Sequence, residues 1–312
     1  MGCSNANFEE TKDKNPKTPE NTSKQNNNNN NNNEPSNKNG KKENGVIKYD
    51  NGEYYKGEQK NGKRQGKGIQ YYKNDEIKYD GDWNNDLQEG NGKLIEKEGN
   101  YYIGEFKNGL KHGKGKEYKK SGDLIYEGDF VNGKKEGYGK LIHEDKTYYE
   151  GEFKNDLKHG DGKTFTEHGF VHFEGNFANN LLNGEGRYFY DDLSGRYYRG
   201  EFKDGKFHGK GIVYNQDDKI IYEGDYVNGQ MDGKGKLVYQ NGTYDVGHFK
   251  NGKRHGDGIE YDKNGKIIQH VTYMDGKIIQ SYYDASGEDI SGDDGEKDYG
   301  EEEGEGCPEE AC

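Results

Sequence analysis

The sequence motif with the most definite chemistry is the N-terminus, where Gly2 and Cys3 follow the initiator methionine. Once that methionine is removed, Gly2 is a candidate for N-myristoylation and Cys3 for S-palmitoylation. One myristoyl chain holds a protein on a membrane only weakly and reversibly, so palmitate on Cys3 would supply the second attachment. The alternative is a chance pair, because Ala6 stands where acylation signals prefer serine or threonine.

Four histidines recur at one place in a repeated frame, which raises the question of a metal site. They are His112, His159, His208 and His255. If each lies two hairpins from the next, neighbours are about 19 Å apart at about 4.8 Å per strand. Zinc needs its ligands at about 2 Å, so we expect no metal site within the chain and no cofactor. A polar turn residue is the favoured interpretation.

Two other recurring patterns resemble fragments of catalytic sites. Gly-Lys-Gly occurs repeatedly, first at residues 66–68, but it lacks the full phosphate-loop frame and no helix follows it. A column of acidic residues occurs once per repeat, whereas a catalytic site is normally singular. Its members are Glu58, Asp82, Glu105, Asp129, Glu152, Glu201 and Asp225. We therefore predict a protein that is not an enzyme.

Composition limits the elements that could position these residues. The chain has 312 residues, of which 27% are hydrophobic and 34% charged, with 50 Gly and 27 Tyr. So few aliphatic residues exclude a large globular core. The net charge of −13 is concentrated in residues 284–312, which hold thirteen acidic residues and one lysine. The remainder is nearly neutral, so a basic nucleic-acid-binding surface is not indicated.

The two ends of the chain have compositions that do not build a packed core. Residues 1–44 contain eight consecutive asparagines, and residues 284–312 alternate glycine with aspartate and glutamate. Both compositions are typical of disorder. We predict a tether at the N-terminus and an extended, solvated tail at the C-terminus.

The middle of the chain is a repeat with a period of 23–25 residues. Its frame is an aromatic residue, any residue, glycine, an acidic residue and a second aromatic residue, then Asn-Gly or Asn-Asp, then Gly-x-Gly. The alternation predicts a strand, and the asparagine pair predicts a tight turn. Three residues past the second glycine stands an apolar residue, which we predict to be buried. These are Tyr71, Ile95, Tyr118, Ile142, Phe165, Phe189, Tyr214, Val238 and Tyr261.

This pattern resembles the MORN repeat family over residues 46–268, where it recurs nine times. The resemblance implies an all-β fold: an elongated, single antiparallel twisted sheet of consecutive hairpins. We divide the chain into the 1–44 tether, the 45–268 array, a degenerate terminal cap at 269–283, and the 284–312 tail. Two departures are Gln59, where the first copy lacks its second aromatic residue, and Asp245, where the ninth lacks its first.

Two sets of residues are candidates for binding along such a sheet. An aromatic groove would be lined by Trp83, Phe106, Phe130, Phe153, Phe177, Phe202 and Tyr226. Basic turns alternate between odd and even repeats, which suggests either duplication of hairpin pairs or a basic edge. The basic-turn residues are Lys63, Arg64, Lys111, His112, Lys158, His159, Lys206, His208, Lys253, Arg254 and His255.

These observations predict a scaffold or adaptor that binds proteins through the repeats and is anchored by acylation at the cytoplasmic face of a membrane. Without acylation the expected location is the cytoplasm or cytoskeleton. The partners are unidentified proteins, a homodimer stays open, and no nucleic acid is expected. Two alternatives are recognition of anionic phospholipid by the basic turns and a regulatory subunit that positions a separate enzyme.

Overall fold

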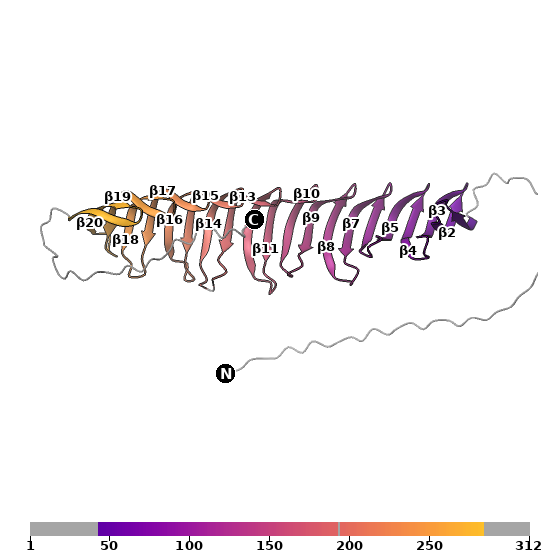
Figure 1. Ribbon diagram of the computed structural model, residues 1–312, viewed down its shortest axis with the longest axis horizontal. Helices are drawn as coiled ribbons and strands as arrows, with labels where there is room; N and C mark the ends of the chain where they lie inside the picture. Colours follow the sequence, from indigo (N-terminus) through magenta and orange to yellow (C-terminus); the bar gives the residue numbers. More distant parts are fainter. Residues whose placement is uncertain (1–42, 193, 284–312) are drawn as a thin grey trace, which may run out of the picture. The chain divides into compact units, whose positions relative to one another are not determined.

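The computed structural model describes residues 43–192 and 194–283, and these form one all-β sheet of 21 strands (Figure 1). The strands are β1 (Glu43–Lys48), β2 (Tyr54–Lys60), β3 (Lys63–Tyr71), β4 (Ile77–Asn84), β5 (Leu87–Ile95), β6 (Tyr101–Lys107), β7 (Leu110–Tyr118), β8 (Leu124–Val131), β9 (Lys134–Ile142), β10 (Tyr148–Lys154), β11 (Leu157–Phe165), β12 (Val171–Ala178), β13 (Leu181–Phe189), β14 (Tyr197–Lys203), β15 (Lys206–Tyr214), β16 (Ile220–Val227), β17 (Gln230–Val238), β18 (Tyr244–Lys250), β19 (Lys253–Tyr261), β20 (Ile267–Met274) and β21 (Lys277–Tyr283). The predicted all-β, single antiparallel sheet is confirmed. No helix in the described part of the chain is long and apolar enough to cross a membrane.

Each strand from β2 to β20 pairs antiparallel with the strand before it and the strand after it, and the end strands β1 and β21 each have one partner, so the sheet is an unclosed series of hairpins. The β2–β3 hairpin turns at Asn61 and Gly62, whose φ angles are 54° and 75°. Positive φ at both positions matches the twist of the flanking strands, and asparagine and glycine adopt it readily. The predicted Asn-Gly turns therefore set the hairpin spacing.

The core is a ladder of aromatic rings on one side of the sheet, which we call the core face. Tyr102 is 1% exposed and Phe106 is 3% exposed. The Tyr102 ring makes edge-on contacts with Phe106 and with Phe130 of the next hairpin, with centroids 5.2 and 5.1 Å apart. Edge-to-face pairs of this kind stabilise beyond their buried area. Each hairpin is thus joined to its neighbours by rings.

The recurring acidic residue has a structural task on the opposite side, which we call the outer face. The carboxylate of Glu105 accepts the backbone N–H of Lys114, the middle residue of Gly-x-Gly, at 3.1 Å. Gly113 has a φ of 57°, which leaves that N–H outside the regular ladder. The same contact recurs from Glu58 to Lys67 and from Asp225 to Lys234. The acidic column therefore satisfies backbone donors.

The apolar residue that follows Gly-x-Gly is half-buried, and the prediction that it is the buried position of its strand is wrong. Tyr118 pairs in register with Tyr101, which alternates with the core residue Tyr102 and so lies on the outer face. The two rings stack there with centroids 4.8 Å apart. The prediction failed because the offset identifies a repeated position without saying which face it occupies.

The last hairpin contains the segment that we predicted as a terminal cap, residues 269–283. It extends the sheet through β20 and β21. All seven residues of β21 are exposed, including Ile279 at 57% and Tyr283 at 65%. Within the described residues the sheet thus ends in β21, which pairs only with β20.

Candidate functional site

The seven aromatic residues predicted to line a groove are core residues. Trp83, Phe106, Phe130, Phe153, Phe177, Phe202 and Tyr226 are 1–5% exposed and belong to one buried cluster. Each ring packs between the tyrosine or phenylalanine of its own hairpin and that of the preceding one, as Phe106 does between Tyr102 and Tyr79. Their side chains offer almost no surface to a partner, so a groove lined by them is corrected to an aromatic core.

The residues of the predicted basic turns lie in two different environments. Lys63, Lys206 and Lys253 are exposed at the turn edge. The next residue of the turn points to the core face and is half-buried above the aromatic rings, as seen for Arg64, Lys111, Lys158 and Arg254. The guanidinium of Arg64, for example, lies 3.9 Å from the Trp83 ring centroid. The turns therefore do not form one uniform basic edge.

Two of the core-face cations share one carboxylate. Lys111 Nζ lies 2.6 Å from Glu117 Oε1, and Lys135 Nζ lies 3.1 Å from Glu117 Oε2. The two ammonium groups also face the rings of Tyr102 and Tyr126, at 5.1 and 4.9 Å from the centroids. Burial raises the pKa of Glu117, but the hydrogen bonds and charges of the two lysines outweigh it and lower the pKa overall.

Lys158 occupies the equivalent place two hairpins further along. Its Nζ lies 3.4 Å from His143 Nε2 and 5.2 Å from the Tyr149 ring centroid. Burial lowers the pKa of Lys158. Burial also lowers the pKa of His143, and the neighbouring Lys158 ammonium lowers it further. Both groups are therefore disfavoured in their charged forms.

The four turn histidines are half-buried and lie far apart along the sheet. The Nδ1 atoms of His112 and His159 have no hydrogen-bond partner among the described residues. The backbone carbonyls of His112, His159 and His208 accept hydrogen bonds from the hydroxyls of core tyrosines. In residues 43–192 and 194–283, no group of three or more His, Cys, Asp or Glu could hold a metal ion.

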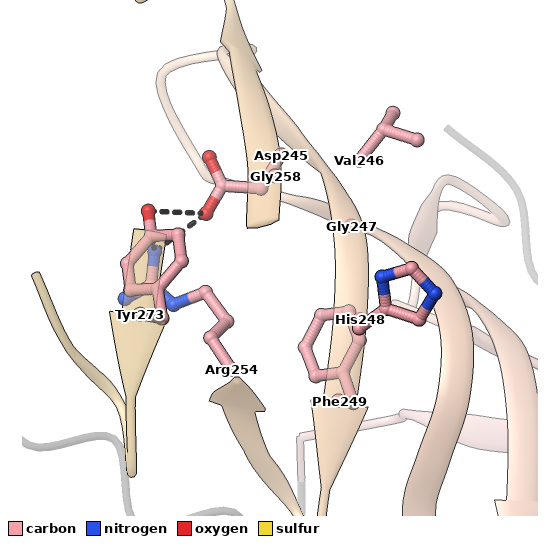
Figure 2. Close-up of a pocket in the computed structure, with 8 residues that line it drawn as sticks. All are labelled: Asp245, Val246, Gly247, His248, Phe249, Arg254, Gly258 and Tyr273. Carbon is pink, nitrogen blue, oxygen red and sulfur yellow. Dashed lines mark hydrogen bonds and ion pairs between the residues drawn. The ribbon is translucent and has the colours of Figure 1, made fainter. Parts of the chain in front are cut away.

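The ninth repeat replaces its core tyrosine with a buried polar cluster (Figure 2). Asp245 is 4% exposed, and its Oδ2 lies 2.5 Å from Arg254 Nη1. The Tyr239 hydroxyl donates to the same carboxylate at 2.6 Å, and Tyr273 donates to Glu260 at 2.7 Å. Figure 2 shows Asp245, Arg254 and Tyr273 pointing toward one another.

The space inside this cluster is too small for a substrate. Its cavity measures about 10 Å³, which is near the least that a single water molecule needs. Burial and the hydrogen bond to Asp245 raise the pKa of Tyr239, so that hydroxyl stays protonated as a donor. The cluster is therefore a structural replacement for the missing ring.

The outer face keeps large apolar side chains in contact with solvent. They are Val46, Ile77, Leu87, Ile103, Leu110, Val131, Tyr138, Ile220, Val227 and Val246, each 36–59% exposed. Between them lie stacked pairs of aromatic rings with centroids 4.5–4.8 Å apart. The pairs are Tyr54–Tyr71, Tyr101–Tyr118, Tyr148–Phe165, Tyr197–Tyr214 and Tyr244–Tyr261. They recur every second hairpin.

The predicted acylation residues Gly2 and Cys3 lie outside the described residues, as do residues 1–42 of the predicted 1–44 tether and the predicted tail at 284–312. Nothing in the sheet bears on their chemistry. Residues 43 and 44, which we assigned to the tether, belong to β1.

A family model described as the MORN repeat matches the chain nine times. The matched segments are residues 55–76, 79–99, 102–124, 126–148, 149–164, 173–194, 198–217, 222–244 and 246–267. Together they cover more than half of the chain. The chain belongs to the MORN repeat family. Its nine MORN repeats agree in number with the resemblance drawn from the sequence.

The other comparisons add little to the MORN assignment. No curated protein matches the chain. Among solved structures, a protein of unknown function from Bacteroides caccae matches with 13% identity and a TM-score of 0.18. The match covers 78% of this chain and 86% of that chain. At that TM-score it bears on neither fold nor function.

The MORN frame did not reveal two features of the surface. The first is the row of stacked outer-face rings, which the Tyr-Tyr pairs of odd repeats, such as Tyr101-Tyr102, could have signalled. The second is the set of side chains beside Lys111 and Lys158 on the core face: Glu117 contacts Lys111 and Lys135, and His143 contacts Lys158. These positions vary from repeat to repeat, so they stand out only when one hairpin is compared with its counterparts.

Proposed function

We propose that the chain is a non-enzymatic, membrane-associated scaffold or adaptor that binds proteins through its MORN sheet. The observation that carries the proposal is the outer face, where ten large apolar side chains are exposed. Large apolar side chains that stay exposed on the same face as five pairs of stacked rings are typical of interaction sites. Ion pairs such as Lys140–Glu150 lie among the apolar residues. That mixture suits a protein partner better than a bilayer interior.

The membrane part of the proposal rests on Gly2 and Cys3. Myristate on Gly2 with palmitate on Cys3 provides the two attachments that stable anchoring needs. Residues 4–42 would then separate the anchor from the sheet. The expected location is the cytoplasmic face of the plasma membrane or of an internal membrane.

The protein-binding part is tested by comparing the proteins that the full chain retains in cells. Ile103→Asp places a charge on the outer face at a side chain that is 44% exposed, and Glu144→Lys alters an exposed turn as the matched control. We expect Ile103→Asp to lose most of a defined set of proteins that the wild type and the control both retain. Equal sets from all three chains would contradict the proposal.

A second candidate function is binding of anionic phospholipid at the turn edge. A depression of about 360 Å³ lies at the first turns, and Lys60 and Lys63 line it together with amide side chains. Such a lining suits a phosphate group. The test measures binding of the Gly2→Ala chain, which cannot be myristoylated, to vesicles that contain phosphatidylserine. Binding that weakens with added salt and in the double variant Lys60→Gln/Lys63→Gln would support phospholipid binding at the turn edge. No binding at low salt would contradict it.

A further inference from the structure

Within the described residues, one cation on the core face has no carboxylate partner, whereas its counterparts in other repeats have one. This cation is Lys158 of the fifth repeat. The same position holds Arg64, Lys111 and Arg254 in the first, third and ninth repeats, and Phe207 in the seventh. Arg64 pairs with Asp86, Lys111 with Glu117 and Arg254 with Asp245. The printed contacts of the Lys158 ammonium are His143 and the Tyr149 ring. Among the described residues no carboxylate forms an ion pair with it.

The different surroundings of Lys111 and Lys158 follow from sequence differences between their repeats. Glu117, which pairs with Lys111, corresponds after 47 residues to Thr164. Glu96 in the preceding hairpin corresponds in the same way to His143. The carboxylate that Lys111 binds is therefore replaced at the Lys158 position by a hydroxyl side chain, and the side chain that contacts Lys158 Nζ is a histidine.

The local charge on this part of the core face is positive. Lys111, Lys135 and Lys158 follow one another on β7, β9 and β11, and Glu117 is the carboxylate paired with the first two. A half-buried ammonium without a counter-charge is costly, and a carboxylate offsets that cost through a charge-assisted hydrogen bond. Burial lowers the pKa of Lys158, and burial and the Lys158 ammonium lower the pKa of His143 although the nearby Asp145 carboxylate partly offsets them.

We propose that carboxylates of the C-terminal segment, residues 284–312 of the same chain, bind at Lys158 and His143 on the core face. The segment holds thirteen acidic residues and one lysine, so its charge is complementary to the site. This contact goes beyond the scaffold role and does not depend on it, because it uses the core face and leaves the outer face free.

The length of the segment is sufficient for this contact. The segment begins at the end of β21, and β11, which carries Lys158, is ten strands away, or about 48 Å at about 4.8 Å per strand. Glu301 follows Tyr283 by 18 residues, which span up to about 60 Å when extended. Attachment to the same chain raises the local concentration of the carboxylates, although by less than for a short linker, because a flexible 18-residue chain has an r.m.s. end-to-end length of only about 23 Å.

The direct test is zero-length carbodiimide coupling of the full chain, followed by mass spectrometry. The reagent joins a lysine amine to a carboxylate only where the two are in contact. We expect an amide between Lys158 and residues 284–312, about tenfold more abundant than with exposed Lys63 or Lys277, as for a charge-assisted bond. Each yield is normalised to the reactivity of that lysine with a small acylating reagent. A mixture of light and heavy isotope-labelled chains separates contacts within one chain from contacts between chains.

A second measurement keeps the test independent of lysine reactivity. The His143 ring resonances are compared by NMR in the wild type and in the full chain with Glu301, Glu302, Glu303 and Glu305 changed to glutamine. We expect the substitutions to shift the His143 resonances and to leave those of distant His255 unchanged. Coupling spread evenly over exposed lysines, coupling mainly between light and heavy chains, or unchanged His143 resonances would each overturn the proposal.

Discussion

The ring of Tyr102 lies directly over Gly115 on the paired strand, so closely that a β-carbon on Gly115 would sit 2.2 Å from the tyrosine hydroxyl oxygen. The hydroxyl itself donates to the backbone carbonyl of Glu105 at 3.0 Å, which holds the ring in place. A glycine that usually weakens a strand is therefore required here by a neighbouring ring. This contact recurs along the MORN array and is the unit of its stability.

We predict that Gly115→Ala destabilises the sheet strongly, because Tyr102 would have to leave its position. Overpacking of a well-packed core costs about 1–3 kcal/mol or more, and we expect the upper part of that range. The measurement is the free energy of unfolding by denaturant.

The matched control for this prediction is Gly258→Ala in the ninth repeat. There Asp245 replaces the core tyrosine, and the nearest atom to an added β-carbon is the Val246 carbonyl oxygen at 3.3 Å. We expect this change to cost less than about 1 kcal/mol. Equal losses from Gly115→Ala and Gly258→Ala would contradict the explanation by the ring.

The corrected location of the aromatic residues gives a second prediction. Phe153→Ala removes a ring that is 3% exposed and should cost about 3–5 kcal/mol. Tyr138→Ala removes a ring on the outer face that is 59% exposed and should change stability by less than about 0.5 kcal/mol. Thermal unfolding of the two variants distinguishes a core ring from a surface ring. Similar losses would contradict the assignment of faces.

The buried tyrosines predict unfolding at alkaline pH. Burial raises the pKa of Tyr55 to about 12 and also raises the pKa of other core tyrosines. These are Tyr79, Tyr102, Tyr126, Tyr149 and Tyr222. Their folded pKa values lie above the unfolded value of about 10, so their contribution is complete below that pH and is lost as the pH rises.

The loss should be steep because several tyrosines act together. Each lowers the free energy of unfolding by about 1.4 kcal/mol per pH unit between its unfolded and folded pKa. We expect tyrosinate absorbance and loss of β-sheet circular dichroism to appear in one cooperative transition above about pH 10. Titration of these tyrosines at that pH with the sheet intact would show that the rings are accessible to solvent.

The buried pair in the ninth repeat gives a fourth prediction. Asp245→Ala leaves Arg254 half-buried without its carboxylate and should cost about 3–5 kcal/mol. Asp245→Ala/Arg254→Met removes both charges and should recover most of that loss. A double-mutant cycle on the free energy of unfolding measures the coupling. Strictly additive losses would mean that the two groups do not depend on each other.

Most of the fold could be predicted from the sequence because the signals are local and repeated. The Asn61-Gly62 turn and the alternation around Tyr102 report on a few neighbouring residues, and nine copies remove the ambiguity of one. Which face of the sheet each side chain occupies was harder to predict. Phe106 and Tyr118 are both regularly spaced aromatic residues, but only the strand register places Phe106 in the core and Tyr118 on the outer face.

The core-face site was beyond sequence reasoning for a different physical reason. Lys111 and Lys158 occupy equivalent positions and look alike in an alignment of the repeats. Their difference depends on whether residue 117 or 164 supplies a carboxylate across the hairpin, which requires knowing which side chains meet. A regular repeat predicts its shared contacts well and its exceptional ones poorly.

The membrane-anchored scaffold is tested most directly by the partition of the full chain between membrane and soluble fractions in eukaryotic cells. The wild type is compared with Gly2→Ala and with Cys3→Ser. Our account predicts that the wild type is membrane-bound and that both variants become soluble, because each loses one of two required lipid attachments. A soluble wild type, or three chains that partition alike into the membrane, would contradict anchoring by the acylated N-terminus.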